Sequence, residues 1–356
     1  MKDTKEFIYK IIASDGTATG FKVAGYPFLI TNYHVVAGGK EVAVENHNKD
    51  RFLGKVIMVN TDLDLAFISV EELASANSSI ILDEYLTVKE NQMVTINGFP
   101  LGMSFTVTQG IVSLSQNDIN NKNMIQTDAA INSGNSGGPM LTEDGIFVGV
   151  VTSKYRNAEN MGFAIAYNDV IKQIKDYNFS EYTYRVRCNS CDSFVENETT
   201  FCDSCGAAIN ASVYEEFEKS YFTEIVENAL IEELGMNPIL CRTGTDEYWE
   251  FHKGNALIRI FINGNYIRIT SPISKLPKKN LNDLLTYLTS GNEFPYSMGI
   301  YKNKIYLSYR TYEREIYYDE KNRLKHHIRN LALKADELSR FLKDKFACEM
   351  PDESKK

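Results

Sequence analysis

Short apolar runs separated by turns fill the first half of the chain. Gly, Asn and Asp lie between these runs, which occupy residues 42–46, 52–59, 65–70, 93–97, 104–114, 123–127, 146–153 and 162–166. Many short strands at regular spacing predict a pair of all-β barrels. Residues 21–30 predict a further hairpin, which turns near Gly25 and Pro27. Helical periodicity begins only near 168–176, so we expect one helix after the strands.

The last third of the chain mixes helix and strand patterns. An amphipathic helix is predicted within 213–234, with apolar positions at Phe217, Tyr221, Ile225, Ala229 and Leu230. A helix at 279–290 interrupts the strand-like runs, which are 247–252, 256–262, 266–271, 296–300 and 304–310. From Leu324 to Leu342 apolar residues recur every three or four positions, which favours a core-facing helix over a coiled-coil partner. We expect an α+β domain with an antiparallel sheet.

The stretch Gly134-Asn-Ser136-Gly-Gly-Pro places a serine between glycines. Glycines let the backbone turn tightly and point N–H groups at the atom that the serine attacks. A serine hydroxyl alone is a weak nucleophile, so it needs a base and an orienting acid. His34 lies upstream in Thr-Asn-Tyr-His-Val-Val, and acids lie in Asp62-Leu-Asp64-Leu-Ala-Phe-Ile. The order His, Asp, Ser is that of chymotrypsin-like double β-barrels, which indicates a serine protease.

Further sequence blocks resemble the HtrA/DegP branch of the trypsin-like proteases. They span about residues 5–176 and comprise 125–132, Gly98–Gly102 with Thr108–Ser113, and Met161–Ile165. The resemblance implies a chymotrypsin-like double β-barrel and an ATP-independent serine endopeptidase acting on proteins or peptides. A catalytically silent, trypsin-fold peptide-binding adaptor is the alternative, which the intact triad disfavours. No PDZ-like segment and no export signal are recognised, so we expect a cytoplasmic protein.

The predicted catalytic roles follow from this order. Ser136 is the nucleophile, His34 is the general base and later the general acid, and the N–H groups of Gly134 and Ser136 form the oxyanion hole. Strand alternation would point Asp62 and Asp64 to one face, so geometry alone does not choose between them. The Asp-Leu-Ala-Phe-Ile context matches the family position at Asp64, which we therefore assign as the acid.

The same resemblance suggests a substrate pocket. Ile131 would line the S1 pocket, and Ser153 and Tyr155 would come from the adjoining strand. No acid lies at these positions, so a small or medium aliphatic P1 residue is expected rather than Lys or Arg. An extended substrate would pair its backbone along 151–155.

Four of the six cysteines form two closely spaced pairs. Cys188 and Cys191 are followed after a ten-residue spacer by Cys202 and Cys205. Two C-x2-C turns suit a tetrahedral site of four thiolates and resemble a zinc ribbon. We therefore predict a structural Zn²⁺ without a catalytic role, whose binding helps this short segment to fold. Two redox disulfides are the alternative, and they lack a thioredoxin-like context.

Composition and charge limit the classes of partner that the chain is expected to bind. The chain has 356 residues, of which 43% are hydrophobic and 24% charged, and its net charge is −9. Residues 1–180 carry 14 Lys and Arg against 20 Asp and Glu, residues 181–212 carry 2 against 5, and residues 213–356 carry 22 against 22. No segment has the basic excess that phosphate backbones require, so nucleic acid is not expected as a partner. The sequence has no apolar stretch of about 20 residues, so no membrane-spanning helix is expected.

Four segments are predicted. They are a protease domain at 1–180, a zinc ribbon at 181–212, an α+β domain at 213–350 and a polar tail at 351–356. The helix and strand order of the third segment resembles the YbjN and type III secretion chaperone-like fold. That resemblance implies recruitment of a protein partner, self-association or regulation. The frequent Asn, Lys, Ile and Tyr suggest a bacterial origin.

Overall fold

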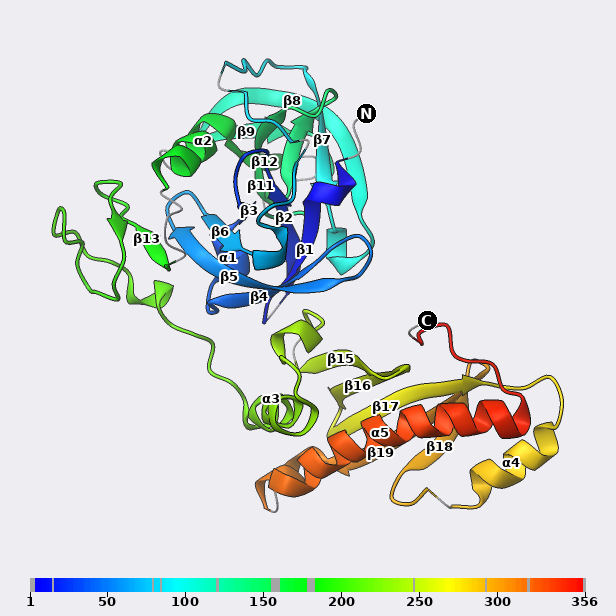
Figure 1. Ribbon diagram of the computed structural model, residues 1–356. Coiled ribbons are helices and arrows are strands. Elements are labelled where there is room, and N and C mark those ends of the chain that lie inside the picture. Colours follow the sequence, from blue (N-terminus) through cyan, green and yellow to red (C-terminus); the bar gives the residue numbers. More distant parts are fainter. Residues whose placement is uncertain are drawn as a thin grey trace. The chain divides into compact units, whose positions relative to one another are not determined.

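Strand-forming residues close into two six-stranded barrels in the computed structural model (Figure 1). The structure describes residues 4–14, 16–78, 80–83, 85–119, 122–154, 161–177, 183–245, 247–291, 293–318 and 321–354. The first barrel has the order β5-β4-β1-β2-β3-β6 and closes where β6 pairs with β5. Its strands are β1 (Ile8–Ile12), β2 (Thr17–Lys22), β3 (Phe28–Thr31), β4 (Glu41–Glu45), β5 (Arg51–Asn60) and β6 (Leu65–Ser69).

The second barrel follows directly in the chain. Its order is β10-β11-β12-β9-β8-β7, and it closes where β10 pairs with β7. Its strands are β7 (Met93–Gly98), β8 (Thr106–Ile119), β9 (Lys122–Thr127), β10 (Pro139–Thr142), β11 (Phe147–Lys154) and β12 (Gly162–Ala166). Helix α2 (Tyr167–Asp176) comes next, as the periodicity predicted. The double-barrel fold is therefore confirmed.

Two strands of the barrels were not predicted. Strand β10 is only four residues long, and β1 has a lysine at its centre. All five residues of β1 are buried, including Lys10, whose ammonium pairs with the buried Glu45 at 3.5 Å. A sequence pattern treats lysine as exposed, whereas an ion pair allows this one to be buried.

Aromatic side chains join the two barrels. Phe28 and Phe67 of the first barrel stack with ring centroids 4.3 Å apart, and Tyr177 meets both rings edge-on. Phe21 lies 5.4 Å from Phe147 of the second barrel. These rings belong to one buried cluster with residues of both barrels, so the barrels share a core.

The cysteine segment extends the sheet of the first barrel. Strand β13 (Arg185–Arg187) pairs in parallel with β5, and β14 (Phe194–Val195) pairs with β13. The chain divides into two compact units, Met1–Phe217 and Glu218–Lys356. The predicted boundaries at 180 and 212 thus lie inside the first unit.

The second unit is an antiparallel sheet with helices, as predicted. The sheet order is β15-β16-β17-β19-β18. Its elements are α3 (Tyr221–Leu234), β15 (Tyr248–Lys253), β16 (Ala256–Asn263), β17 (Tyr266–Lys275), α4 (Leu281–Thr289), β18 (Ser297–Tyr301), β19 (Lys304–Tyr312) and α5 (Lys321–Phe346). Helix α5 runs along one face of the sheet (Figure 1), and its predicted stripe from Leu324 to Leu342 is buried in the core.

Helix α3 begins later than the apolar pattern predicted. Ser220 caps it by accepting a hydrogen bond from the Thr223 N–H, so the helix begins at Tyr221. Phe217 lies before the helix, and its N–H donates to the Gly38 carbonyl in the first unit's fold. None of the helices in the described ranges has the length and apolar composition needed to span a bilayer.

Candidate active site and cysteine cluster

His34 lies in α1 (Tyr33–Val36), a one-turn helix that follows β3. Extended Asn32 precedes this helix, and its side-chain amide donates to the Asp64 carbonyl oxygen at 2.9 Å. The Asp64 carboxylate then contacts His34 twice. Oδ1 accepts the His34 backbone N–H at 2.9 Å, and Oδ2 lies 2.8 Å from Nδ1. A proton on Nδ1 is favoured by this contact, which makes Nε2 the basic nitrogen of the ring.

The structure separates the two candidate acids. Residues 61–64 form a turn before β6, so strand alternation does not apply to them. Asp64 turns inward with its side chain 25% exposed. Asp62 points outward, is 55% exposed, and lies 3.5 Å from the Lys122 ammonium. Only Asp64 of this pair is brought to His34.

Ser136 follows a tight turn at 132–135 that requires glycine. Gly134 has φ +94°, and a Cβ at this position would lie 2.4 Å from the Phe99 carbonyl oxygen. The Ser136 carbonyl accepts the Thr19 N–H at 2.9 Å, which ties the second barrel's loop to β2. The Ser136 hydroxyl donates to the Thr152 carbonyl oxygen at 3.1 Å.

Thr152 in β11 connects the acid and the serine, and sequence reasoning did not identify it. Its hydroxyl donates to Asp64 Oδ2 at 2.5 Å, while its carbonyl accepts the Ser136 hydroxyl. A short hydrogen bond to a carboxylate is a strong one. The one feature of the sequence that pointed toward Thr152 was its position in the segment 151–155, which was expected to pair with the substrate backbone.

The N–H groups predicted to form the oxyanion hole differ in their hydrogen bonding from the N–H groups of neighbouring residues. The Asn135 N–H donates to Asn132, and the Gly137 N–H donates to Val151. Within the described parts of the chain, the N–H groups of Gly134 and Ser136 have no protein acceptor. Two unused donors, one from the serine itself and one from the residue two positions before it, can stabilise an oxyanion.

The predicted substrate pocket is described in part. Ile131 is buried, 9% exposed, and its Cδ1 lies 2.3 Å from where a Cβ on Gly162 would stand. Glycine at 162 therefore makes room for the Ile131 side chain. Ser153 belongs to β11 opposite Phe163, but its side chain and all of Tyr155 lie outside the described residues.

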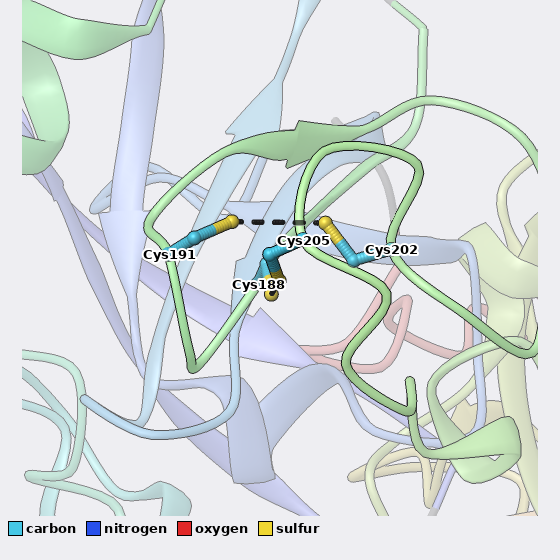
Figure 2. A group of neighbouring side chains, drawn as sticks. All are labelled: Cys188, Cys191, Cys202 and Cys205. Carbon is cyan, nitrogen blue, oxygen red and sulfur yellow. Dashed lines mark hydrogen bonds between the residues drawn. The ribbon is translucent and has the colours of Figure 1, made fainter.

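The four predicted metal ligands converge. Figure 2 shows the thiols of Cys188, Cys191, Cys202 and Cys205 gathered from two turns. The sulfur atoms of Cys191 and Cys202 are 3.7 Å apart, and those of Cys188 and Cys205 are 3.8 Å apart. Four sulfurs at about 2.3 Å from one tetrahedral Zn²⁺ would be about 3.8 Å apart, so the donor set fits zinc. A disulfide needs about 2 Å between its sulfurs, so the alternative of two disulfides is not formed here.

The thiols interact strongly with one another. Hydrogen bonding to Ser193 lowers the pKa of the Cys191 thiol to about 6. The Ala207 N–H favours the Cys205 thiolate, but the Cys191 sulfur, desolvation and the sulfurs of the other two cysteines together outweigh it and raise the pKa of Cys205 to about 12. Four thiolates this close repel one another, so a cation is needed to hold them all ionised.

The cysteine segment shares a hydrophobic core with the first barrel. Cys188 and Cys202 are buried in the same cluster as Val35 and Val36 of α1. Tyr184 packs against this cluster, and its hydroxyl donates to the Val213 carbonyl oxygen. The helix that carries His34 is therefore supported by the residues that surround the thiols.

Comparisons with known proteins show what this part of the chain resembles. Residues 18–150 match the trypsin-like peptidase domain. A probable periplasmic DegP-like serine endoprotease of Hahella chejuensis is 37% identical over 172 residues, which are 46% of this chain and 36% of that protein. An HtrA-like serine protease of Staphylococcus aureus is 33% identical over 177 residues, 45% of this chain and 23% of that protein. The crystal structure of the serine endoprotease from Yersinia pestis is 25% identical, with a TM-score of 0.45 over 49% of this chain and 63% of that chain.

The chain thus spans only about a third or less of the length of the relatives it resembles. Their similarity covers less than half of this chain. The residues that match the peptidase domain model, 18–150, lie within the part of the chain that forms the two barrels. The first unit therefore contains a trypsin-like peptidase domain similar to those of HtrA and DegP proteases.

Proposed function

We propose that the protein is an ATP-independent serine endopeptidase that cleaves protein or peptide substrates. The observation that carries this proposal is the two-point contact of the Asp64 carboxylate with His34, which leaves Nε2 as the basic nitrogen of the ring, while Thr152 links Asp64 to Ser136. The relatives named as serine proteases support the same chemistry.

In the proposed reaction, Ser136 Oγ attacks the scissile carbonyl carbon and its proton passes to His34 Nε2. The N–H groups of Gly134 and Ser136 stabilise the oxyanion, each donor contributing about 3 kcal/mol. The imidazolium then gives its proton to the leaving amine, and an acyl ester on Ser136 remains. Water, deprotonated by His34, hydrolyses this ester and restores the enzyme. Before attack, the Ser136 hydroxyl turns from the Thr152 carbonyl toward the imidazole.

We also propose that Zn²⁺ is bound by Cys188, Cys191, Cys202 and Cys205 as a zinc ribbon. All four positions around the metal are protein thiolates, so the ion supplies folding energy and has no site open to substrate. A protein with reduced thiols suits a cytoplasmic location, which we propose as well.

The second unit is proposed to recruit a substrate or regulate the peptidase, or to self-associate. Its order of helix, three strands, helix, two strands and helix supports a YbjN-like or secretion-chaperone-like fold.

The proposed endopeptidase activity needs no nucleotide, because the hydrolysis of a peptide bond is thermodynamically favourable.

Labelling with a fluorophosphonate probe, followed by intact mass, tests the proposed function. The wild type and Ser133→Ala should each gain one probe adduct, whereas Ser136→Ala should gain none. Ser133 is a matched control because its side chain is exposed in the same turn. Cleavage of denatured casein should follow the same order. If the folded wild type neither reacts with the probe nor cleaves casein, the domain is a peptide-binding adaptor instead.

A further inference from the structure

The second unit's sheet has two chemically different faces. On β17, Ile267 and Ile269 point into the core beneath α5, while Arg268 and Thr270 alternate to the other side. We call this other side the second face. Its members, set by strand register, include Tyr248, Arg259, Phe261, Tyr266, Arg268, Tyr306, Arg310 and Tyr312. The second face therefore combines arginines with aromatic rings.

Two arginines on this face stand directly opposite each other. Arg268 of β17 is in register with Arg310 of β19, so the two cations share one cross-strand pair. Arg259 is neutralised by Glu250 at 2.8 Å. Among the described residues, no carboxylate forms an ion pair with Arg268 or Arg310. Like charges in this arrangement destabilise a sheet, which an anionic ligand would reverse.

The Arg268 guanidinium also has an unused donor. Its Nε is buried and has no hydrogen-bond partner within the described residues. Phe261 stands opposite Arg268 on β16, and the Arg310 guanidinium lies 4.8 Å from the Tyr266 ring centroid. A ring over a guanidinium, as Tyr266 is at Arg310, leaves the N–H edge of that group to bind a carboxylate.

One end of the second face already holds an acidic peptide. The C-terminal segment with Asp352 and Glu353 lies there. The Glu353 carboxylate is 2.6 Å from the Lys304 ammonium, and the backbone carbonyl oxygen of Glu353 is 2.7 Å from His252 Nε2. Asp352 pairs with Lys275. Lys304 and Arg310 alternate onto the same side of β19, so the tail and the arginine pair use one surface.

We propose that Arg268 and Arg310 form a binding site for an acidic segment of a partner polypeptide. Bidentate hydrogen bonds to Asp or Glu carboxylates would neutralise the pair, and the neighbouring rings would contact the peptide's apolar atoms. A carboxylate suits this site better than a phosphate backbone, because residues 213–356 carry as many acidic as basic residues and so create no extended positive field. This proposal does not depend on proteolytic activity.

Fluorescence anisotropy with a labelled peptide of alternating Glu and Ala tests the site. The full chain carrying Ser136→Ala is used, so that the probe stays intact. It should bind the Glu peptide, lose affinity as ionic strength rises, and bind the matched Gln peptide at least about tenfold more weakly. Arg268→Gln with Arg310→Gln should lose about tenfold for the Glu peptide. Arg329→Gln is the control, because Arg329 lies on α5 against Glu233, at 3.6 Å.

Urea unfolding supplies a second readout. Without peptide, Arg310→Gln should be as stable as its parent or more stable, since it removes the repulsion; its exposed side chain makes it the test variant if Arg268→Gln folds poorly. Equal affinity for the Glu and Gln peptides, or unchanged affinity in the variants, would overturn the proposal. Two further results would also overturn it: tighter binding of single-stranded DNA than of the Glu peptide, or a dimer in sedimentation that the double variant dissociates.

Discussion

Asp64 combines a demanding backbone position with its contact to His34. Its φ of +57° lies in the left-handed region, which Asp, Asn and Gly tolerate far better than other residues. Asn32 and Thr152 hold its backbone and carboxylate in place. Few residue types can therefore adopt the backbone conformation at this position. Of those that can, only Asp has the carboxylate that the proposed chemistry needs.

Asp64→Asn is expected to keep the fold and to lower kcat about 10⁴-fold, because the amide no longer favours the proton on Nδ1. Steady-state hydrolysis of a peptide substrate measures this loss. The matched change Asp62→Asn should leave kcat within about twofold, since it removes only an exposed ion pair with Lys122. Similar losses in both variants would contradict the role of Asp64.

For single residues, the sequence predicted which residues form the candidate site better than it predicted their contacts. The motifs indicated His34, Asp64 and Ser136, and the structure brings the first two into contact. Thr152 could not be recognised, because its role depends on which strand of the second barrel lies beside Asp64. Their roles in catalysis remain predictions.

Among the strands, β1, β4 and β5 are joined by one buried carboxylate. Glu45 accepts contacts from Lys10 at 3.5 Å, Lys49 at 3.1 Å and Arg51 at 3.0 Å. Burial opposes ionisation of Glu45, but the Arg51 hydrogen bond and the three cations outweigh it and lower its pKa below 4.5. The charged form is thus favoured in the folded state.

Glu45 is expected to make the fold acid-sensitive. Since its folded pKa lies below the unfolded one, its stabilisation is present above about pH 4.5 and is lost as pH falls through the folded pKa. Glu45→Gln should lower the free energy of unfolding at neutral pH by about 3 kcal/mol and flatten its fall in acid. Urea titrations across pH measure both. Glu41→Gln, at the other end of β4, is the control, and an equal acid slope in Glu45→Gln and wild type would refute the expectation.

The elements themselves were largely predictable. Turn residues delimited most strands, and periodicity marked α2 and α5. Strand β1 was missed because Lys10 conceals its buried character, and the start of α3 depended on the cap at Ser220. For β1 a partner distant in sequence decides the structure, and for α3 a single capping side chain sets the first residue.

In the whole molecule, the peptidase domain and the cysteine cluster form one body. Strand β13 pairs with β5 of the barrel, and the buried thiols of Cys188 and Cys202 share a core with α1. Sequence suggested separate domains, because spacing reveals the ligands but not the surface on which they pack. A metal held there would stabilise the candidate active site as well.

Cys202→Ser is therefore expected to lose bound metal, to lower the thermal midpoint of the first unit by about 10 °C, and to reduce peptidase activity. Native mass spectrometry, calorimetry and hydrolysis rates measure the three effects. Cys241→Ser should retain the metal, because Cys241 lies in the second unit. A variant at Cys202 that keeps wild-type stability and activity would rule out this coupling.

The pairing of β13 with β5 also sets an order of events during synthesis. A ribosome adds about 5–20 residues per second, so the edge of β5 at Met58–Val59 emerges many seconds before its partner at Arg185–Val186. Until that partner and the four cysteines arrive, the apolar side of α1 has no cover from them. The first unit can therefore complete its core only after Cys205 has been translated, and the proposed peptidase would gain its activity only late in synthesis.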